Sequence, residues 1–316
     1  MKHFIVTAAM MMALSGCNTE AVSGGQTDVS TAQTLIEKPV VHIEIRSDFD
    51  IGLHSPPYVI TASIDDANLM MVGSLHANTP SSDTYKTVRY LIASNAIDMI
   101  ILEGTPASVD IDSAYATLGE CLREASLCRT EMHYAYSLGK SMHADIRFSG
   151  GEAAPLDTYG YIVTQKGYSL EDYIAFWYVR NAVSLNGENG MNEDVLRQQD
   201  AQTKRYLDQQ LGVIAKFDYD DWLAWYRNRM NVATVDLDAF DQAMLRPSVE
   251  EHSTIIERLS YEFNVVRDNH LMVTINDKIN AGFRNILVVY GEGHVRKIYK
   301  ALTDRSTSTP YLSKWF

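Results

Sequence analysis

Short apolar segments alternate with longer amphipathic ones along the chain, a pattern that predicts strands and helices in succession. Two of the short segments, at 98–102 and 285–290, are apolar almost throughout, as expected of strands buried on both faces. The predicted strands, in chain order, are Val40–Arg46, Tyr58–Ala62, Asn68–Val72, Asp98–Leu102, a segment near Asp145–Ser149, and Asn285–Tyr290.

Helix-like segments separate these strands. Residues 79–83 (TPSSD) offer side chains that cap helix N-termini, which predicts a helix from there to about Asn95. Further helices are predicted at about 113–139, 249–282 and 295–303. Because strands and helices alternate, we expect an α/β fold with a mixed, largely parallel sheet flanked by helices.

The middle of the chain, about residues 157–248, has helical spacing and little strand pattern. We therefore expect a helical insertion or cap within one α/β domain that extends over residues 39–316. Its aromatic residues favour core packing over a platform for a planar ligand. They include Trp177, Tyr178, Trp222, Trp225 and Tyr226.

The first residues indicate an export signal. Lys2 supplies a positive charge, and Phe4–Leu14 is apolar but too short to span a membrane. Leu14-Ser15-Gly16-Cys17 resembles the lipobox of bacterial lipoproteins, which implies a signal peptide at 1–16 and a lipid on Cys17. A polar, flexible tether would follow over 17–38. Asn18, and not Asp, follows the cysteine, as in Gram-negative lipoproteins of the outer membrane, and this resemblance implies an anchor there that faces the periplasm.

Net charge limits the partners. The chain has 27 Lys and Arg against 40 Asp and Glu, a formal charge of −13. This acidity argues against nucleic-acid binding and against broad electrostatic attraction to anionic lipid. We therefore expect membrane contact through the lipid anchor and no nucleic-acid partner.

Two cysteines lie within the helix predicted at 113–139. Cys121 and Cys128 are seven positions apart, which is about 10 Å along a continuous helix and too far for a disulfide. An exported chain permits oxidation, but a bond would require a break near Ala125-Ser126. The sequence leaves both states open.

Ionisable residues beside glycines follow four of the predicted strands. They are Gly73-Ser74-Leu75-His76, Glu103-Gly104, Gly150-Gly151-Glu152 and Gly291-Glu292-Gly293-His294. In parallel sheets, functional groups gather at the carboxyl ends of the strands, and glycine permits sharp turns there. Each motif alone also fits a structural role, but together they predict one site of two histidines and two glutamates.

The long helix predicted at 249–282 contributes Arg267-Asp268. An arginine buried on such a helix needs a carboxylate or a substrate oxyanion as its partner, and Glu103 or Glu152 would serve. The alternative is an exposed helix with ordinary ion pairs between successive turns.

The order and spacing of these motifs resemble the TraB/GumN and Tiki group, which is related to erythromycin esterases and ChaN-type haem-binding lipoproteins. Met272 falls one place later than in the family pattern. The resemblance implies an α/β core and, in several branches, hydrolysis. Tiki-like members are metal-dependent proteases, erythromycin esterases activate water with His and Glu, and ChaN-like members bind haem.

Each site residue can be given a role. His76 is the first candidate for general base or metal ligand, with Glu103 to orient it or to ligate beside it. His294 would be a second ligand or the proton donor, and Glu152 a second carboxylate. Arg267 would stabilise an oxyanion or hold Glu103. A divalent metal (Zn, Mn or Co) held by His76, Glu103, Glu152 and His294 is compatible with these ligands, although no HExxH spacing fixes it.

These expectations favour a lipid-anchored hydrolase that cleaves a peptide, ester or amide bond of a peptide or small-molecule substrate. The main alternative is a non-catalytic lipoprotein that binds haem or another small ligand. The sequence has no Gly-x-Ser-x-Gly motif, so a serine nucleophile is not expected.

Overall fold

The computed structural model describes residues 56–76, 81–116, 121–122, 128, 130–189, 193–194, 196–198, 204–205, 217–305 and 311–313. The predicted signal peptide at 1–16, Cys17, the tether to residue 38 and the strand Val40–Arg46 lie outside these residues. The chain divides into two compact units. We call Ala154–Val266 the helical unit, and Val40–Ala153 with Arg267–Phe316 the sheet unit.

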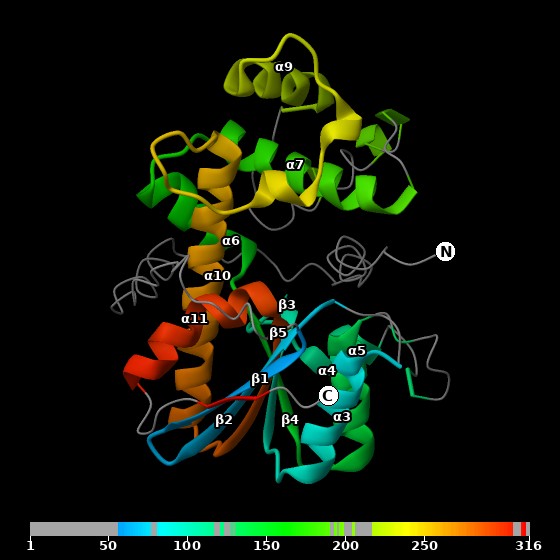
Figure 1. The fold of residues 1–316 in the computed structure, drawn as a ribbon, viewed down its shortest axis with the longest axis vertical. Helices are drawn as coiled ribbons and strands as arrows, with labels where there is room; N and C mark the ends of the chain where they lie inside the picture. Colours follow the sequence, from blue (N-terminus) through cyan, green and yellow to red (C-terminus); the bar gives the residue numbers. More distant parts are fainter. Residues whose placement is uncertain are drawn as a thin grey trace, which may run out of the picture. The chain divides into compact units, whose positions relative to one another are not determined.

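The sheet unit is built on a six-stranded sheet in the order β4-β3-β5-β2-β1-β6 (Figure 1). The strands are β1 (Tyr58–Ile64), β2 (Ala67–Ser74), β3 (Met99–Pro106), β4 (Arg147–Glu152), β5 (Asn285–Gly291) and β6 (Tyr311–Ser313). The neighbours among β4, β3, β5 and β2 pair in parallel, whereas β1 is antiparallel to both β2 and β6. The prediction of a mixed, largely parallel sheet is confirmed.

The central strands β3 and β5 owe their position to their composition. Ile100–Leu102 and Ile286–Val289 are fully buried, so both faces of the sheet are covered here. Continuous apolar runs of this kind are expected only where helices pack on both faces. The two strands therefore form the middle of the sheet.

Within the described residues, five helices flank the sheet, which completes the predicted α/β architecture. They are α3 (Asp83–Ser94), α4 (Ile111–Ala116), α5 (Glu131–Met142), the C-terminal part of α10 (Ile255–Asn280) and α11 (Glu292–Arg305). Helix α3 starts where predicted, with Ser82 accepting a hydrogen bond from the Tyr85 amide. In Figure 1, α3 and α5 lie beside each other on one face of the sheet, and the Tyr85 and Tyr134 rings are 4.4 Å apart.

The prediction of one helix over 113–139 is wrong. Helix α4 ends at Ala116, and α5 begins at Glu131 after Thr130, whose side chain accepts a hydrogen bond from the His133 amide. Between these helices, Cys121 and Cys128 form a disulfide with their Cα atoms 4.6 Å apart. A continuous helix would hold those atoms at about twice that distance. The disulfide and the new N-cap together explain why the helical pattern is interrupted.

The helical unit contains no strand among its described residues. Its elements are α6 (Pro155–Tyr159), the π-helix η4 (Gly160–Gln165), α7 (Leu170–Asn189), α9 (Tyr219–Met230), the short helices η5 (Leu237–Ala239) and η6 (Gln242–Leu245), and the start of α10. The five aromatic residues singled out from the sequence are all buried in one core cluster. Their interpretation as core residues is confirmed.

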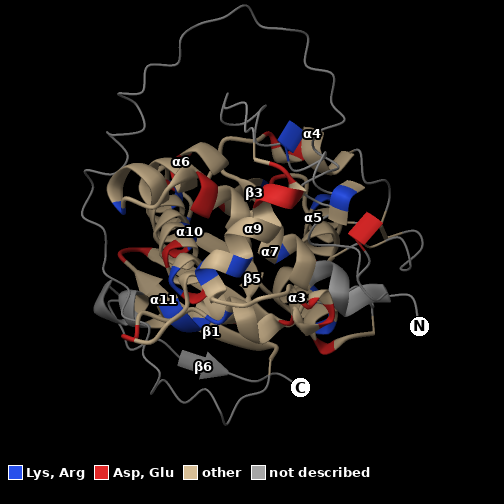
Figure 2. Ribbon diagram, turned by 90° about the horizontal axis from the view of Figure 1, so that it is seen from above, with Lys and Arg blue, Asp and Glu red and all other residues tan. Residues whose placement is uncertain are grey.

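Charged residues of both signs occur on single helices, as on α11 (Figure 2). Arg296 of this helix pairs with Glu292 one turn earlier. Exposed pairs of this kind contribute little to stability. Among the described residues, no helix combines the length and apolar character needed to cross a membrane.

Candidate active site

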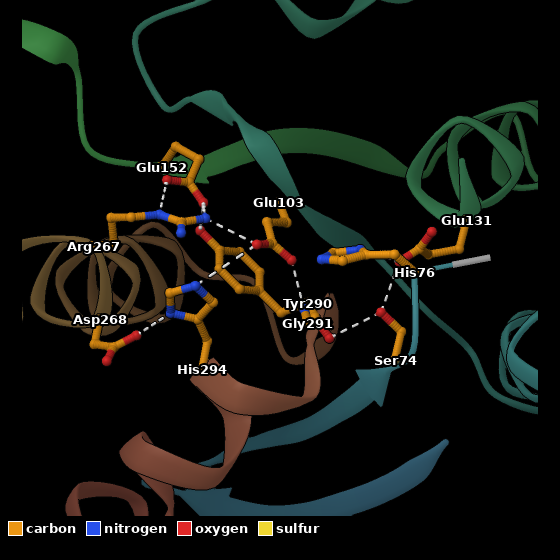
Figure 3. Close-up of polar contacts among 10 residues, drawn as sticks. All are labelled: Ser74, His76, Glu103, Glu131, Glu152, Arg267, Asp268, Tyr290, Gly291 and His294. Carbon is orange, nitrogen blue, oxygen red and sulfur yellow. Dashed lines mark hydrogen bonds and ion pairs between the residues drawn. The ribbon is translucent and has the colours of Figure 1, made fainter. Parts of the chain in front are cut away.

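The predicted site residues come together at one edge of the sheet unit (Figure 3). Strands β2 and β5 run in parallel with Ser74 opposite Gly291, and Leu102 of β3 lies opposite Val289 of β5. Their carboxyl ends therefore meet at the same edge, and the residues that follow them face a common space.

Gly104 lets β3 present Glu103 at this edge. Its φ angle is +81°, a left-handed value that side-chain-bearing residues rarely adopt. The sequence predicted that the strand ends at Leu102, but β3 continues to Pro106, and Gly104 lies where its pairing with β4 is irregular. The positive φ angle at this irregularity favours glycine.

Arg267 joins the two glutamates. Its Nε and Nη2 atoms donate to the two carboxylate oxygens of Glu152, each at 2.6 Å, and Nη2 also donates to Oε1 of Glu103 at 2.9 Å. The side chain is only 17% exposed. The alternative of an exposed helix with ordinary ion pairs does not apply to Arg267.

This arrangement keeps both glutamates ionised. Burial raises the pKa of Glu152, but the charge and hydrogen bonds of Arg267 outweigh burial and lower it to about 2. The Tyr290 hydroxyl also donates to Oε1 of Glu152 at 2.8 Å. Burial likewise opposes ionisation of Glu103, yet His76, His294 and Arg267 lower its pKa overall. Two negatively charged carboxylates therefore share one positively charged guanidinium in this site.

His76 is oriented by a residue that the sequence analysis did not identify. Its Nδ1 lies 2.9 Å from Oε1 of Glu131, the first residue of α5. Glu131 is fully buried, and the Ser74 hydroxyl donates to the same oxygen at 2.8 Å. The His76 side chain itself is 45% exposed, so a ligand can reach it.

Glu131 and Glu103 also set the charge of His76. Desolvation lowers the pKa of the imidazole, but the hydrogen bond to Glu131 and the charge of Glu103 outweigh it and raise the pKa to about 9. His76 is therefore protonated at neutral pH, which suits a proton donor better than the general base expected from the sequence.

His294 has a matching arrangement on the other side of Glu103. Its Nδ1 is hydrogen-bonded to Oδ1 of Asp268, a buried residue of α10. Its Nε2 lies 3.8 Å from Oε1 of Glu103, and its ring stands edge-on to Tyr290. A carboxylate on Nδ1 fixes the ring and leaves Nε2 to face the site.

A metal in this site would compete with Arg267. The guanidinium takes up oxygen atoms of both Glu103 and Glu152 that a divalent cation would need as ligands. Among the described residues, no group of three or more His, Cys, Asp or Glu side chains has the arrangement of a metal site. While Arg267 bonds to both glutamates, a bound ion does not fit among the predicted ligands His76, Glu103, Glu152 and His294. Metal binding by these residues stays a prediction.

All five predicted residues thus lie in one cluster. Three further members stand in the motifs or strands quoted from the sequence but received no role there: Ser74, Asp268 and Tyr290. Glu131 was not identified from the sequence. Asp268 is next to Arg267 in the sequence, and Glu131 follows the Thr130 cap, so each had a local pattern. The error in the helix over 113–139 concealed the second one.

Comparison with known proteins finds no matching family model, no similar curated protein and no similar solved structure.

Proposed function

We propose that the chain is an exported, lipid-anchored hydrolase that cleaves an ester, amide or peptide bond with water activated by His and Glu side chains. The observation that carries the proposal is the pair of histidines, each oriented by a buried carboxylate, on either side of the buried Glu103. Positioned acids and bases of this kind supply about 10²–10⁴-fold in rate.

His294 is the general base in this mechanism. Asp268 accepts the Nδ1 proton of its ring and stabilises the imidazolium that forms when Nε2 takes a proton from water. Glu103, whose Oε1 is 3.8 Å from that Nε2, stabilises the same positive charge and orients the water.

His76 is the general acid. Its pKa of about 9 keeps a proton on Nε2 at neutral pH. The water oxygen attacks the carbonyl carbon and its proton moves to His294. The tetrahedral intermediate then expels the alcohol or amine, which takes the Nε2 proton of His76. Proton transfer from His294 to His76 through solvent restores the starting state.

Arg267 and Glu152 act by position. Arg267 donates to both carboxylates, and these bonds favour the role of holding Glu103 over that of binding an oxyanion. Glu152 in turn fixes the guanidinium through two hydrogen bonds. The pair keeps Glu103 ionised at the edge of the sheet.

The raised pKa of His76 also weighs against the haem-binding alternative. An imidazole that ligates iron must have an unprotonated nitrogen, and a pKa of about 9 opposes this at neutral pH. Membership of the TraB/GumN and Tiki group would agree with either a metal-free or a metal-dependent hydrolase.

The experiment is a hydrolysis assay of the purified full-length chain against a panel of esters, amides and peptides. We expect turnover by the wild type and a loss of at least about 100-fold in the activity of Glu103→Gln. The control His143→Ala, at an exposed residue that follows α5, should keep wild-type activity. Failure of the wild type to cleave any substrate, with or without added Zn, Mn or Co, would contradict the proposal. A Soret band that disappears in His76→Ala would favour the haem-binding alternative.

The anchor has its own test. Labelled fatty acid is expected to appear on the chain and on His143→Ala, but not on Cys17→Ala. Equal labelling of Cys17→Ala would exclude Cys17 as the acceptor.

A further inference from the structure

Ser74, the last residue of β2, places its buried hydroxyl between two other elements of the sheet unit (Figure 3). Its Oγ atom lies 2.8 Å from Oε1 of Glu131, the first residue of α5, and 3.2 Å from the backbone oxygen of Tyr290 in β5. A hydroxyl has one proton to donate, so the shorter contact, to the carboxylate, is the stronger of the two. Ser74 therefore connects the start of α5 to the sheet.

The spacing of Ser74 and His76 in the sequence brings both residues to the same carboxylate oxygen. In an extended chain, side chains two positions apart lie on one side, and the side chain between them lies on the other. Leu75, the residue between them, is 55% exposed, which agrees with this alternation. The Nδ1 atom of His76 lies 2.9 Å from the Oε1 of Glu131 that also accepts the Ser74 hydroxyl.

Ser74 is the better fixed of these two donors. Its backbone is part of the parallel pairing of β2 with β5, opposite Gly291, and its side chain is buried. The His76 side chain lies beyond the end of β2 and is 45% exposed, so packing leaves its ring more freedom to turn. The orientation of the ring therefore depends on a Glu131 carboxylate that is itself held in place.

We propose that Ser74 is a positioning residue of the candidate site, which holds the carboxylate of Glu131 and through it the ring of His76. Its part in hydrolysis rests on the proposed function, in which His76 is the general acid. Tyr290, which accepts the longer contact from Ser74, has its ring edge-on to His294. Ser74 thus also links the surroundings of the two histidines.

Ser149 of β4 provides a matched control in the same sheet. It is a buried strand residue like Ser74, but its hydroxyl donates to the backbone oxygen of the adjacent Gly150 at 3.1 Å. Replacement by alanine removes the same atom from both residues. Only Ser74→Ala takes a hydrogen bond away from Glu131, so a difference between the two variants reports on that bond.

The first experiment is a set of crystal structures of the full chain: wild type, Ser74→Ala and Ser149→Ala. We expect the contact between Nδ1 of His76 and Oε1 of Glu131 in the wild type and in Ser149→Ala. In Ser74→Ala we expect it to be lost, with the carboxylate or the ring in another orientation. An unchanged contact in Ser74→Ala, or no contact in the wild type, would overturn the inference.

Kinetics provide a readout that a purely structural role would not give. We expect Ser74→Ala to lower kcat by at least about tenfold with an unchanged KM, and Ser149→Ala to change neither. In a His76→Ala background, Ser74→Ala should have no further effect, because the ring that it positions is gone. An equal loss in both backgrounds would show that Ser74 does not act through His76, and would overturn the inference.

The two experiments separate this inference from the proposed function, because the structures require no substrate. If the wild type hydrolyses nothing but Ser74→Ala displaces the His76 ring, the positioning role stands and the proposed function fails. If the wild type is active and Ser74→Ala keeps its kcat, the proposed function stands and the positioning role fails.

Discussion

Both units bury a carboxylate against an arginine, but the two clusters differ in what surrounds them. In the helical unit, the carboxylate of Asp172 accepts two hydrogen bonds from Arg229, at 2.8 and 3.0 Å. It also accepts hydrogen bonds from the Trp225 indole at 2.8 Å and from the backbone N–H of Ser169 at 3.2 Å. In the sheet unit, Arg267 serves two carboxylates at once.

The difference separates a structural carboxylate from a reactive one. Asp172 has one arginine and neutral donors on both oxygens, an arrangement that stabilises a fold. Glu103 shares its arginine with Glu152, and Nε2 of His294 lies 3.8 Å from its Oε1. Excess negative charge beside oriented histidines is typical of a catalytic site.

Removal of the shared arginine should have the largest effect. Arg267→Ala leaves two buried carboxylates without their partner, so we expect a loss of about 3–5 kcal/mol in the free energy of unfolding. Arg229→Ala is the control and should cost less than half as much, because Trp225 still donates to Asp172 and Arg229 is 47% exposed. Chemical denaturation measures both, and equal losses would refute the distinction.

Acid should destabilise the sheet unit through Glu152. Its folded pKa of about 2 lies below the value of about 4.3 for an unfolded glutamate. Its contribution is therefore present above about pH 4.3 and is lost as the pH falls through about 2, about 3 kcal/mol in total. Glu152→Gln should flatten this part of the pH dependence of unfolding, whereas an unchanged curve would show that Arg267 does not stabilise the carboxylate.

The disulfide should stabilise the segment that leads to Glu131. Replacing Cys121 and Cys128 with serine is expected to cost about 2 kcal/mol, since the closed loop is short. We also expect a fall in activity, because Glu131 begins the next helix and orients His76. A double variant with wild-type stability and activity would show that the disulfide neither stabilises the fold nor supports the orientation of His76.

The smallest effect is on the alkaline limb of activity. A general acid with a pKa of about 9 is protonated below that value, so kcat/KM should fall about tenfold per pH unit above pH 9. In His76→Ala the remaining activity should lack this limb, while His143→Ala should keep it. If kcat/KM of His76→Ala still fell above pH 9, the general acid would be another residue.

The strand ends of the site were predictable from sequence because their signals are local. Apolar runs identified β3 and β5, and neighbouring glycines marked Glu103, Glu152 and His294 as candidate site residues. Parallel pairing then placed them at one edge. The prediction required only the order of strands and helices.

Glu131 and Asp268 were harder to predict because both lie on helices. A buried acid on a helix looks like a solvated one in the sequence, and only tertiary packing turns it toward a histidine. The interruption between α4 and α5 had the same cause, since the Cys121–Cys128 disulfide depends on a fold that composition does not reveal.

The most direct test of the central claim is a double-variant cycle of kcat/KM on His76→Ala and His294→Ala. If the two histidines act together on one substrate around Glu103, the double variant should lose little more than the more damaging single variant. Losses that multiply would show that the histidines act independently, and would contradict the account.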